Sequence, residues 1–305
     1  MTAPPRTHTA AQLQGYAMVG GSFLIMGSIG ALVDYSSAPE SMLLVLRMAI
    51  AAVVLGMIFA RRRPLAGLRT PGVPLRLLVL CVVDTMALLF FFVALRSTNV
   101  AIGMFLTFTA PVWVALIAPR VLRTRTEPVV YVAVLIALGG LATIVVPSLT
   151  GEVLHVSVPG LFLGAASGLG YATFQMMVKG LSRHVSSVTI VLSETVLDSL
   201  ILLPLALWQT VGAGYALTRR DLLVAAILGV VCTALAYTLW TEGQRRVRVQ
   251  HASILGYLEP VSAPVYALLL LGEHPNLWTL VGGALIIIAG ALVMYFGEPE
   301  ELMPT

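Results

Sequence analysis

Charged side chains inside long apolar runs are the residues of this sequence best placed to do chemistry. Glu259 lies near the middle of the apolar run 251–271, which is long enough to cross a bilayer at about 20 residues per span. An ionisable group at that depth costs roughly 2.5–3.5 kcal/mol on insertion scales, so it usually faces a cavity or a partner. Pro260 follows and has no N–H to donate to the helix. We expect the helix to bend or unwind at Glu259, either in a transport pathway or as a plain kink beside a neutral glutamate.

Three further ionisable residues lie within apolar runs. Asp84 could act in function, as a proton site or as the partner of a substrate amine. The alternative is a neutral buried acid that is hydrogen-bonded to a neighbouring helix. Arg47 stays charged and needs a carboxylate or carbonyl partner. Glu194 matches Arg47 at an offset of 147 residues, close to the repeat described below. We therefore predict a structural ion pair between Arg47 and Glu194, with direct contact of Arg47 to substrate as the alternative.

Aromatic and amide side chains could complete a binding cavity around these charges. Tyr171 and Gln175 share a helix face, and Phe174 lies near it, which suits a ligand with an apolar side chain. The alternative is ordinary packing with one hydrogen bond between helices. Tyr237 and Trp240 are three residues apart, although Trp240 equally suits the aromatic belt at a membrane interface. The candidate cavity residues are Asp84, Tyr171, Phe174, Gln175, Tyr237, Trp240, Tyr257 and Glu259.

The composition fixes the class of protein that must position these groups. The 305 residues are 58% hydrophobic and 10% charged, whereas an ordinary soluble domain is about 25% charged. Strand-like alternation is absent, so we predict an all-α integral membrane protein. Ten transmembrane helices are expected at 13–33, 39–59, 75–95, 99–119, 128–146, 158–178, 187–208, 221–241, 251–271 and 277–296. The connections are short, which argues against a membrane-anchored enzyme.

Enzyme signatures are missing from the sequence. It contains no phosphate-binding glycine loop, no HExxH, no GxSxG and no Cys/His metal spacing. We therefore expect no enzyme activity, no catalytic residues, no cofactor, no metal site and no ATP-driven pumping. Cys81 and Cys232 both lie in apolar runs and are interpreted as small core residues.

Basic residues lie between the spans, so they orient the chain rather than bind nucleic acid. With the N-terminus in the cytoplasm, only Arg96, Arg219 and Arg220 of the 18 lysines and arginines fall outside, and Arg47 falls within a span. The positive-inside rule then places both termini in the cytoplasm. The first apolar run is of spanning length, so we expect no cleavable signal peptide.

The two halves of the chain show a weak internal repeat. A shift of 149 residues places Arg96 on Arg245, Val100 on Val249, Leu106 on Leu255, Pro111 on Pro260, Val112 on Val261 and Ala118 on Ala267. Each half has five spans, an odd number, so the second half enters the membrane from the opposite face. Such inverted repeats place the substrate near the midplane, between the halves. Pro111 and Pro260 are then paired helix interruptions at which we expect the gates.

These features together resemble the drug/metabolite transporter superfamily, EamA type. The resemblance is carried by ten short spans in two halves, by the Glu259-Pro260 pair and by Leu271-Gly272-Glu273 after it. The first half departs from the pattern, because Ala110 replaces the glutamate before Pro111. The chain is most similar to bacterial inner-membrane amino-acid exporters of the YddG kind. The resemblance implies a central cavity surrounded by spans 1, 3, 4, 6, 8 and 9, with spans 5 and 10 outside it.

The sequence thus predicts a secondary transporter that exports small metabolites, most plausibly neutral or aromatic amino acids, by alternating access. The alternatives are a proton-coupled multidrug exporter and, further away, a membrane-embedded enzyme or scaffold. The expected partners are a small-molecule substrate, the lipid bilayer and, as a candidate, protons; the protein would be a monomer or homodimer in a bacterial inner membrane. The expected division is a cytoplasmic tail at 1–12, five-helix repeats at 13–150 and 151–297, and a second cytoplasmic tail at 298–305.

Overall fold

The structure is a computed structural model that describes residues 9–60, 66–98, 100–145 and 157–298. Most of both predicted tails lies outside the described residues. So do Asn99, at which span 4 was expected to begin, Val146, at which span 5 was expected to end, and the basic residues Arg6, Arg61, Arg62 and Arg63 of the orientation argument.

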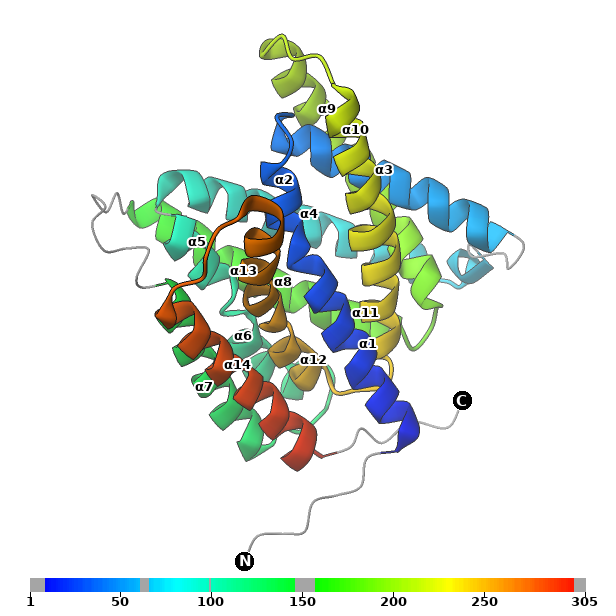
Figure 1. Cartoon of the computed structure of the whole chain (residues 1–305). Coiled ribbons are helices and arrows are strands. Elements are labelled where there is room, and N and C mark those ends of the chain that lie inside the picture. Colours follow the sequence, from blue (N-terminus) through cyan, green and yellow to red (C-terminus); the bar gives the residue numbers. More distant parts are fainter. Residues whose placement is uncertain (1–8, 61–65, 99, 146–156, 299–305) are drawn as a thin grey trace, which may run out of the picture.

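Ten helical spans long and apolar enough to cross a membrane make up the described chain, and no strand occurs within it, so the predicted fold class is confirmed (Figure 1). A helix is the form in which an apolar segment can satisfy its backbone hydrogen bonds within lipid. The spans are α1 (Ala10–Met26) with α2 (Ser28–Asp34), α3 (Glu40–Phe59), α4 (Val73–Ser97), α5 (Val100–Thr107) with α6 (Ala110–Val121), α7 (Pro128–Val145), α8 (Val158–Leu181), α9 (Ser187–Gly212), α10 (Arg219–Ile227) with the π-helical segment η4 (Leu228–Leu235) and α11 (Ala236–Gln244), α12 (Val249–Leu255) with α13 (Leu258–Leu271), and α14 (Leu277–Phe296). A short 3₁₀ turn, η2 (Ala66–Arg69), precedes α4.

Side-chain caps begin several of these helices. The hydroxyl of Ser157 accepts a hydrogen bond from the N–H of Gly160 at the start of α8, and Ser186 does the same for Thr189 at the start of α9. Such caps satisfy backbone donors that have no partner within the helix. They fix where these spans begin.

Spans 4 and 9 are both broken just before a proline. In span 4, Phe108 and Thr109 separate α5 from α6, and Pro111 lies in the first turn of α6. In span 9, Gly256 and Tyr257 separate α12 from α13. The sequence predicted a break at Glu259, whereas the structure has the break just before that residue. The physical reason is that Pro260 leaves the carbonyl of Gly256, four residues earlier, without its helical donor.

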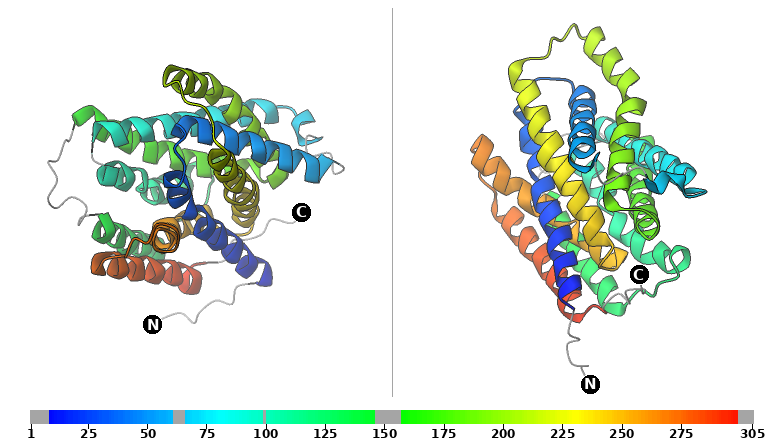
Figure 2. Two further views of the ribbon diagram at one scale, coloured as in Figure 1. Left: turned by 45° about the horizontal axis from the view of Figure 1, so that its top comes forward. Right: turned by 90° about the vertical axis from the view of Figure 1, so that its right-hand side faces the viewer.

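Helix contacts pair the two halves in a regular way. Span 5 packs along span 10, span 2 along span 7, span 3 along span 6 and span 1 along span 8 (Figures 1 and 2). Exchanging each span of one half for its counterpart in the other half maps this set of pairs onto itself. The pattern supports the interpretation of the chain as two repeats.

Helices α7 and α14 meet at two glycines on the outside of the bundle. A Cβ at Gly140 would lie 2.7 Å from the carbonyl oxygen of Gly282, and a Cβ at Gly282 would overlap the carbonyl oxygen of Gly140. Small residues at such crossings let two backbones approach closely. Gly282 therefore packs within the bundle.

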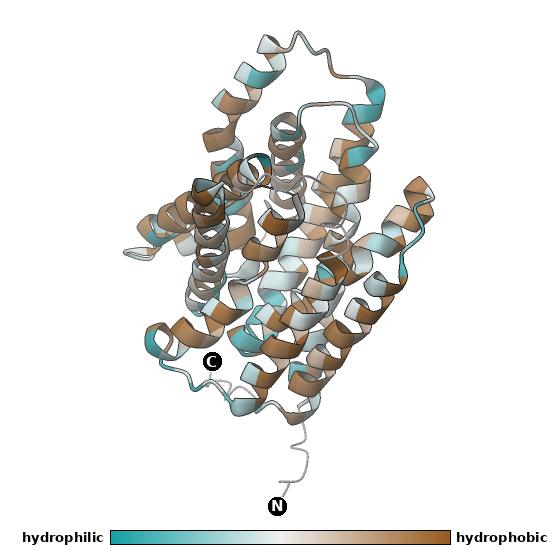
Figure 3. Ribbon diagram, turned by 90° about the vertical axis from the view of Figure 1, so that its left-hand side faces the viewer, coloured by the Kyte–Doolittle hydropathy of each residue, from teal (hydrophilic) through white to brown (hydrophobic). Residues whose placement is uncertain are grey.

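Large apolar side chains cover the outer surface of the helices. Met57, Leu135, Val211 and Leu269 are all well exposed. Figure 3 shows apolar residues along the outer helices, with hydrophilic residues gathered near the connections. This distribution fits a molecule whose solvent at the sides is lipid rather than water.

Candidate functional site

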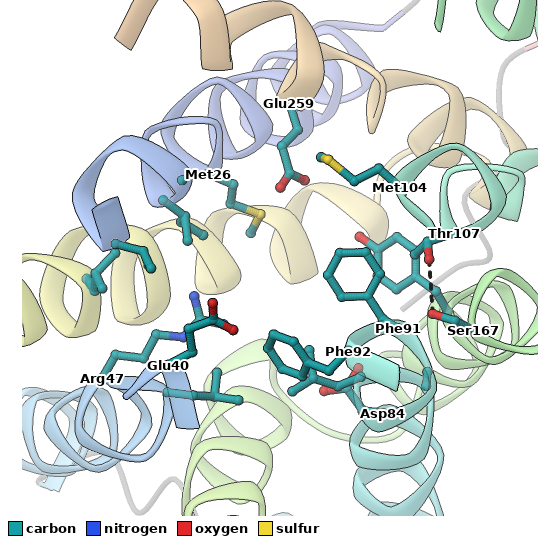
Figure 4. Close-up of a pocket in the computed structure, with 18 of the residues that line it drawn as sticks. Met26, Glu40, Arg47, Asp84, Phe91, Phe92, Met104, Thr107, Ser167 and Glu259 are labelled. Atoms are coloured by element: carbon teal, nitrogen blue, oxygen red, sulfur yellow. Dashed lines mark hydrogen bonds between the residues drawn. The ribbon is translucent and has the colours of Figure 1, made fainter. Parts of the chain in front are cut away.

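A cavity of about 530 Å³ lies between the two halves (Figure 4). It reaches Asp34 at the end of α2 and Glu40 at the start of α3, and both residues are exposed. The cavity therefore opens at the end of the bundle away from the first residue of α1. Its lining is mostly apolar, with aromatic side chains from α4, α8 and α11.

The described lining residues come from spans 1, 3, 4, 6, 8 and 9, as the resemblance implied, and none comes from span 5 or span 10. Spans 2 and 7 also contribute, which was not expected: the lining includes Glu40, Leu43, Leu44, Arg47 and Met48 of span 2 and Glu194 of span 7. Close packing explains the position of span 2: a Cβ at Gly229 would lie 2.8 Å from the carbonyl oxygen of Arg47, so η4 and α3 touch at the backbone.

Six of the eight predicted cavity residues line this cavity: Asp84, Tyr171, Phe174, Tyr237, Trp240 and Glu259. Gln175 does not line it and is almost completely buried in the bundle. Tyr257 does not line it either; it is buried and donates a hydrogen bond of 2.7 Å to the carbonyl oxygen of Phe108. Both misses have one cause, because helical periodicity gives the face of a side chain but not which helix covers that face.

The aromatic residues form a stacked wall. The rings of Tyr171 and Phe174 have centroids 6.1 Å apart, and those of Phe174 and Trp240 are 5.5 Å apart and nearly parallel. Trp240 is buried within the bundle, so the interfacial-belt alternative for this residue is wrong. Stacked aromatic rings offer a broad apolar surface to a ligand.

Charged groups face the cavity from opposite sides. Glu259 points into it from α13, whereas Arg47 and Asp84 lie across from Glu259 (Figure 4). Arg47 donates one long hydrogen bond of 3.4 Å from Nη2 to the hydroxyl of Tyr237, and its buried Nε has no hydrogen-bond partner. Arg47 lines the cavity, and a guanidinium there can pair with a carboxylate of a ligand.

The predicted Arg47–Glu194 ion pair is not formed in this structure. Neither carboxylate oxygen of Glu194 has a hydrogen-bond partner, although the side chain is fully buried. Arg47 instead reaches Tyr237. Both residues line the same cavity, but repeat position does not set the direction in which each side chain extends.

Glu194 belongs instead to a group of three acids. One carboxylate oxygen from each of Asp84, Glu194 and Asp198 lies within 4.8 Å of the others. The hydroxyl of Thr85 donates to Asp198 at 3.2 Å. Two ionised carboxylates at that separation repel by about 3.5 kcal/mol at an effective dielectric constant of about 20. Asp198 lies one helical turn after Glu194 on the same helix face, as its spacing in the sequence indicates.

Several further residues that the sequence did not single out line the cavity in Figure 4. Phe91 and Phe92 lie on α4, Met104 lies on α5, and Thr107 donates a hydrogen bond of 3.2 Å to Ser167. These residue types occur throughout the spans, so composition and spacing carry no signal that separates them from ordinary packing.

A polar network closes the opposite end of the bundle. Arg248 forms an ion pair of 2.7 Å with Glu127, and the Nε2 atom of His251 lies 3.4 Å from the same carboxylate. The hydroxyl of Tyr16 lies 2.6 Å from Nδ1 of His251. Burial raises the pKa of Glu127, but hydrogen bonding and charge from His251 and Arg248 outweigh burial and hold that pKa below its ordinary value.

A buried lysine fastens span 6 to the end of span 8 nearby. The Nζ atom of Lys179 donates to the carbonyl oxygens of Gln244 at 2.5 Å and Val247 at 2.8 Å. A cation at a helix C-terminus is favoured by the helix dipole and satisfies carbonyls that the helix leaves free. The cavity is thus open at one end and held shut at the other.

Comparison with known proteins agrees with this architecture. The EamA-like transporter family matches residues 13–146 and again residues 158–296, so each half of the chain is matched once. An uncharacterized transporter of Archaeoglobus fulgidus is 33% identical over 75% of this chain and 79% of its own length. The uncharacterized inner membrane transporter YicL of Salmonella typhimurium is 28% identical over 72% of each chain.

A solved crystal structure shares the fold at 18% sequence identity. Its TM-score is 0.75, and the match covers 94% of this chain and 97% of that one. The names of the relatives are those of transporters rather than enzymes. The chain is a multi-pass membrane transporter, and it belongs to the EamA-like transporter family.

Proposed function

We propose that this transporter exports small metabolites, foremost neutral or aromatic amino acids, across a bacterial inner membrane, with both termini in the cytoplasm. One observation carries the proposal: a single cavity holds the guanidinium of Arg47 and, across from it, the carboxyl group of Glu259, with aromatic side chains in the same lining. Arg47 suits the carboxylate of an amino acid, and Asp84 or Glu259 suits its ammonium group. The rings of Tyr171 and Phe174 suit an apolar side chain. This is the substrate class of the YddG-like exporters that the sequence resembles.

Alternating access is the mechanism that this geometry supports. The cavity reaches exposed residues at one end only, while the Glu127–Arg248 pair and the Lys179 contacts hold the other end closed. Under the proposed orientation, the open end faces outward. The breaks before Pro111 and Pro260 are the points at which spans 4 and 9 can change angle. Movement of one half against the other would then open the closed end.

A second candidate is a proton-coupled multidrug exporter, which the charge of the cavity favours. Glu40 and Asp34 at its mouth add to the acids within it, whereas Arg47 is the one cationic side chain among its described lining residues. An acidic, aromatic cavity of this kind suits organic cations. In either case the lipid bilayer surrounds the protein. Proton use and a monomeric or homodimeric state remain predictions.

A growth experiment separates the two candidates. Overproduction in a bacterial host should relieve growth inhibition by a toxic analogue such as fluorophenylalanine, while leaving sensitivity to cationic dyes unchanged. Arg47→Gln is the variant that should abolish relief, and Arg96→Gln, whose side chain is exposed, is its matched control. Resistance to the dyes without relief from the analogue would replace amino acids with organic cations as the cargo.

A further inference from the structure

Two buried acidic groups in this protein differ sharply in the donors around them. Asp221 is 1% exposed and accepts hydrogen bonds from the hydroxyls of Ser36, Thr218 and Tyr215 and from the backbone N–H groups of Ser37 and Thr218. That many donors replace the water that an ionised carboxylate loses on burial. Asp221 is therefore built to be charged.

Glu194 is built in the opposite way. It is fully buried, and neither of its oxygens accepts a hydrogen bond. Its neighbour Asp198 has one donor, the hydroxyl of Thr85, and its second oxygen has no partner. An anion in such surroundings is strongly disfavoured, whereas a protonated carboxyl group removes the charge and supplies an O–H donor to the group beside it.

The charges around the cluster do not remove this conflict. Among the described residues, the titratable and charged groups that face it are Arg47 from α3, Cys81 from α4, Tyr171 from α8 and Tyr237 from α11, with Glu259 from α13 across the cavity. Arg47 is the one cation among them, and it can balance one carboxylate. Three carboxyl groups with oxygens within 4.8 Å of one another therefore cannot all be ionised beside it.

We propose that Asp84, Glu194 and Asp198 form a proton-binding site that holds at least one exchangeable proton beside the cavity. Asp84 gives this proton its route, because it is half-buried and lines the cavity that opens past Asp34 and Glu40. A carboxylate of the cluster takes a proton from hydronium in the cavity, leaving water, and returns it by the reverse step. The proton site would let a transporter exchange protons for a substrate that carries an amine. In that respect it deepens the proposed function, and it rests on that function only for the identity of the cargo.

Carbodiimide labelling tests the site without any cargo. Dicyclohexylcarbodiimide adds to protonated carboxyl groups in apolar surroundings, and mass spectrometry of the digested full-length protein locates the adduct. We expect an adduct on Asp84, Glu194 or Asp198 near neutral pH, falling roughly tenfold per pH unit once the cluster ionises. Asp221 and Glu127, which have donors or a cation for a charged carboxylate, serve as unlabelled controls in the same digest. The variant Glu273→Gln, at an exposed residue after α13 that does not line the cavity, should label like the wild type.

Infrared spectroscopy provides a second readout, and it does not require that a reagent reach the cluster. The wild type should show the C=O band of a protonated carboxyl group, shifted in heavy water, and Glu194→Gln or Asp198→Asn should remove or shift it. Absence of this band together with absence of an adduct overturns the proposal, as does an adduct confined to Glu259. Protection from labelling by sodium at constant pH would support it, because the cation can protect only by displacing the proton that the reagent requires. None of these outcomes depends on amino-acid transport, so the proton site and the proposed cargo can fail separately.

Discussion

Tyr257 donates a hydrogen bond of 2.7 Å to the carbonyl oxygen of Phe108, and the two residues stand 149 positions apart, the same offset that aligns the halves of the chain. Each lies at the break of its own span, so the two interruptions touch at equivalent points. The break in span 4 leaves the Phe108 carbonyl without its helical donor, because the N–H of Val112 bonds to Thr109 instead. Tyr257 supplies the missing donor. The contact therefore ties together the two points at which the halves are expected to bend.

Removing this hydroxyl should loosen the contact between the breaks. Tyr257→Phe leaves a buried carbonyl unpaired, which costs about 1–3 kcal/mol, so thermal unfolding in detergent should occur a few degrees lower than in the wild type. Tyr295→Phe, at a well-exposed tyrosine, is the matched control and should unfold like the wild type. Equal unfolding temperatures for the two variants would mean that the Tyr257 bond is not made in the protein.

Gly27 should tolerate no side chain. It separates α1 from α2, and a Cβ there would overlap Oγ of Ser262 and lie 2.8 Å from the carbonyl oxygen of Glu259. Overpacking of this kind costs roughly 1–3 kcal/mol, so Gly27→Ala should lower the unfolding temperature. Gly21→Ala meets nothing within 4 Å and should be neutral or slightly stabilising. The packing of span 1 on span 9 would be wrong if the two variants behaved alike.

The closed end of the bundle should weaken in acid. The pKa of Glu127 lies below its ordinary value of 4.5, so the folded state binds its proton less readily than the unfolded chain does. The carboxylate therefore contributes stability that is present above pH 4.5 and is lost as pH falls through the lower folded pKa. Glu127→Gln should be less stable than the wild type at neutral pH, by on the order of 2 kcal/mol.

The difference between Glu127→Gln and the wild type should then shrink toward zero as the pH is lowered. Unfolding temperatures measured across a pH series test this directly. Glu273→Gln, at an exposed residue after α13, should run parallel to the wild type at every pH. A constant difference between Glu127→Gln and the wild type down to acid pH would contradict the Arg248 pairing.

Arg47 should discriminate cargo that carries a carboxylate. Loss of its charged hydrogen bonds in Arg47→Gln should raise the KM for phenylalanine by roughly tenfold or more and leave phenethylamine, which has no carboxylate, little changed. The comparison uses purified protein of normal yield in proteoliposomes, with Arg96→Gln as control. Loss of yield, or equal loss for both compounds, would instead assign Arg47 the structural role that the sequence analysis favoured.

Much of the architecture could be predicted because membrane spans are continuous apolar segments with charges between them. The paired prolines Pro111 and Pro260 located both helix breaks to within a few residues, because the N–H that proline lacks would have bonded to a carbonyl four residues earlier in the same helix. The π-helical segment η4 had no such marker, and the structure shows it as part of span 8. Local chemistry therefore gave the spans and their interruptions.

The site was less predictable because it depends on contacts between spans. The position of Asp84 and Glu259 within apolar runs singled them out in the sequence, because a charged group in lipid is costly, and both line the cavity. The same reasoning paired Arg47 with Glu194, but the structure turns Glu194 toward Asp84 and Asp198. Whether an apolar residue such as Phe91 or Phe92 lines the cavity depends on which helix packs opposite it. The spacing of residues within one span does not reveal that helix.

The most direct test of this account is counterflow of labelled phenylalanine in proteoliposomes that contain the purified full-length protein. We expect saturable uptake that is stimulated by unlabelled phenylalanine inside and reduced in Arg47→Gln. An imposed pH gradient should accelerate net uptake in the wild type but not in Asp84→Asn. Absence of uptake for every neutral and aromatic amino acid tested would contradict the proposed cargo.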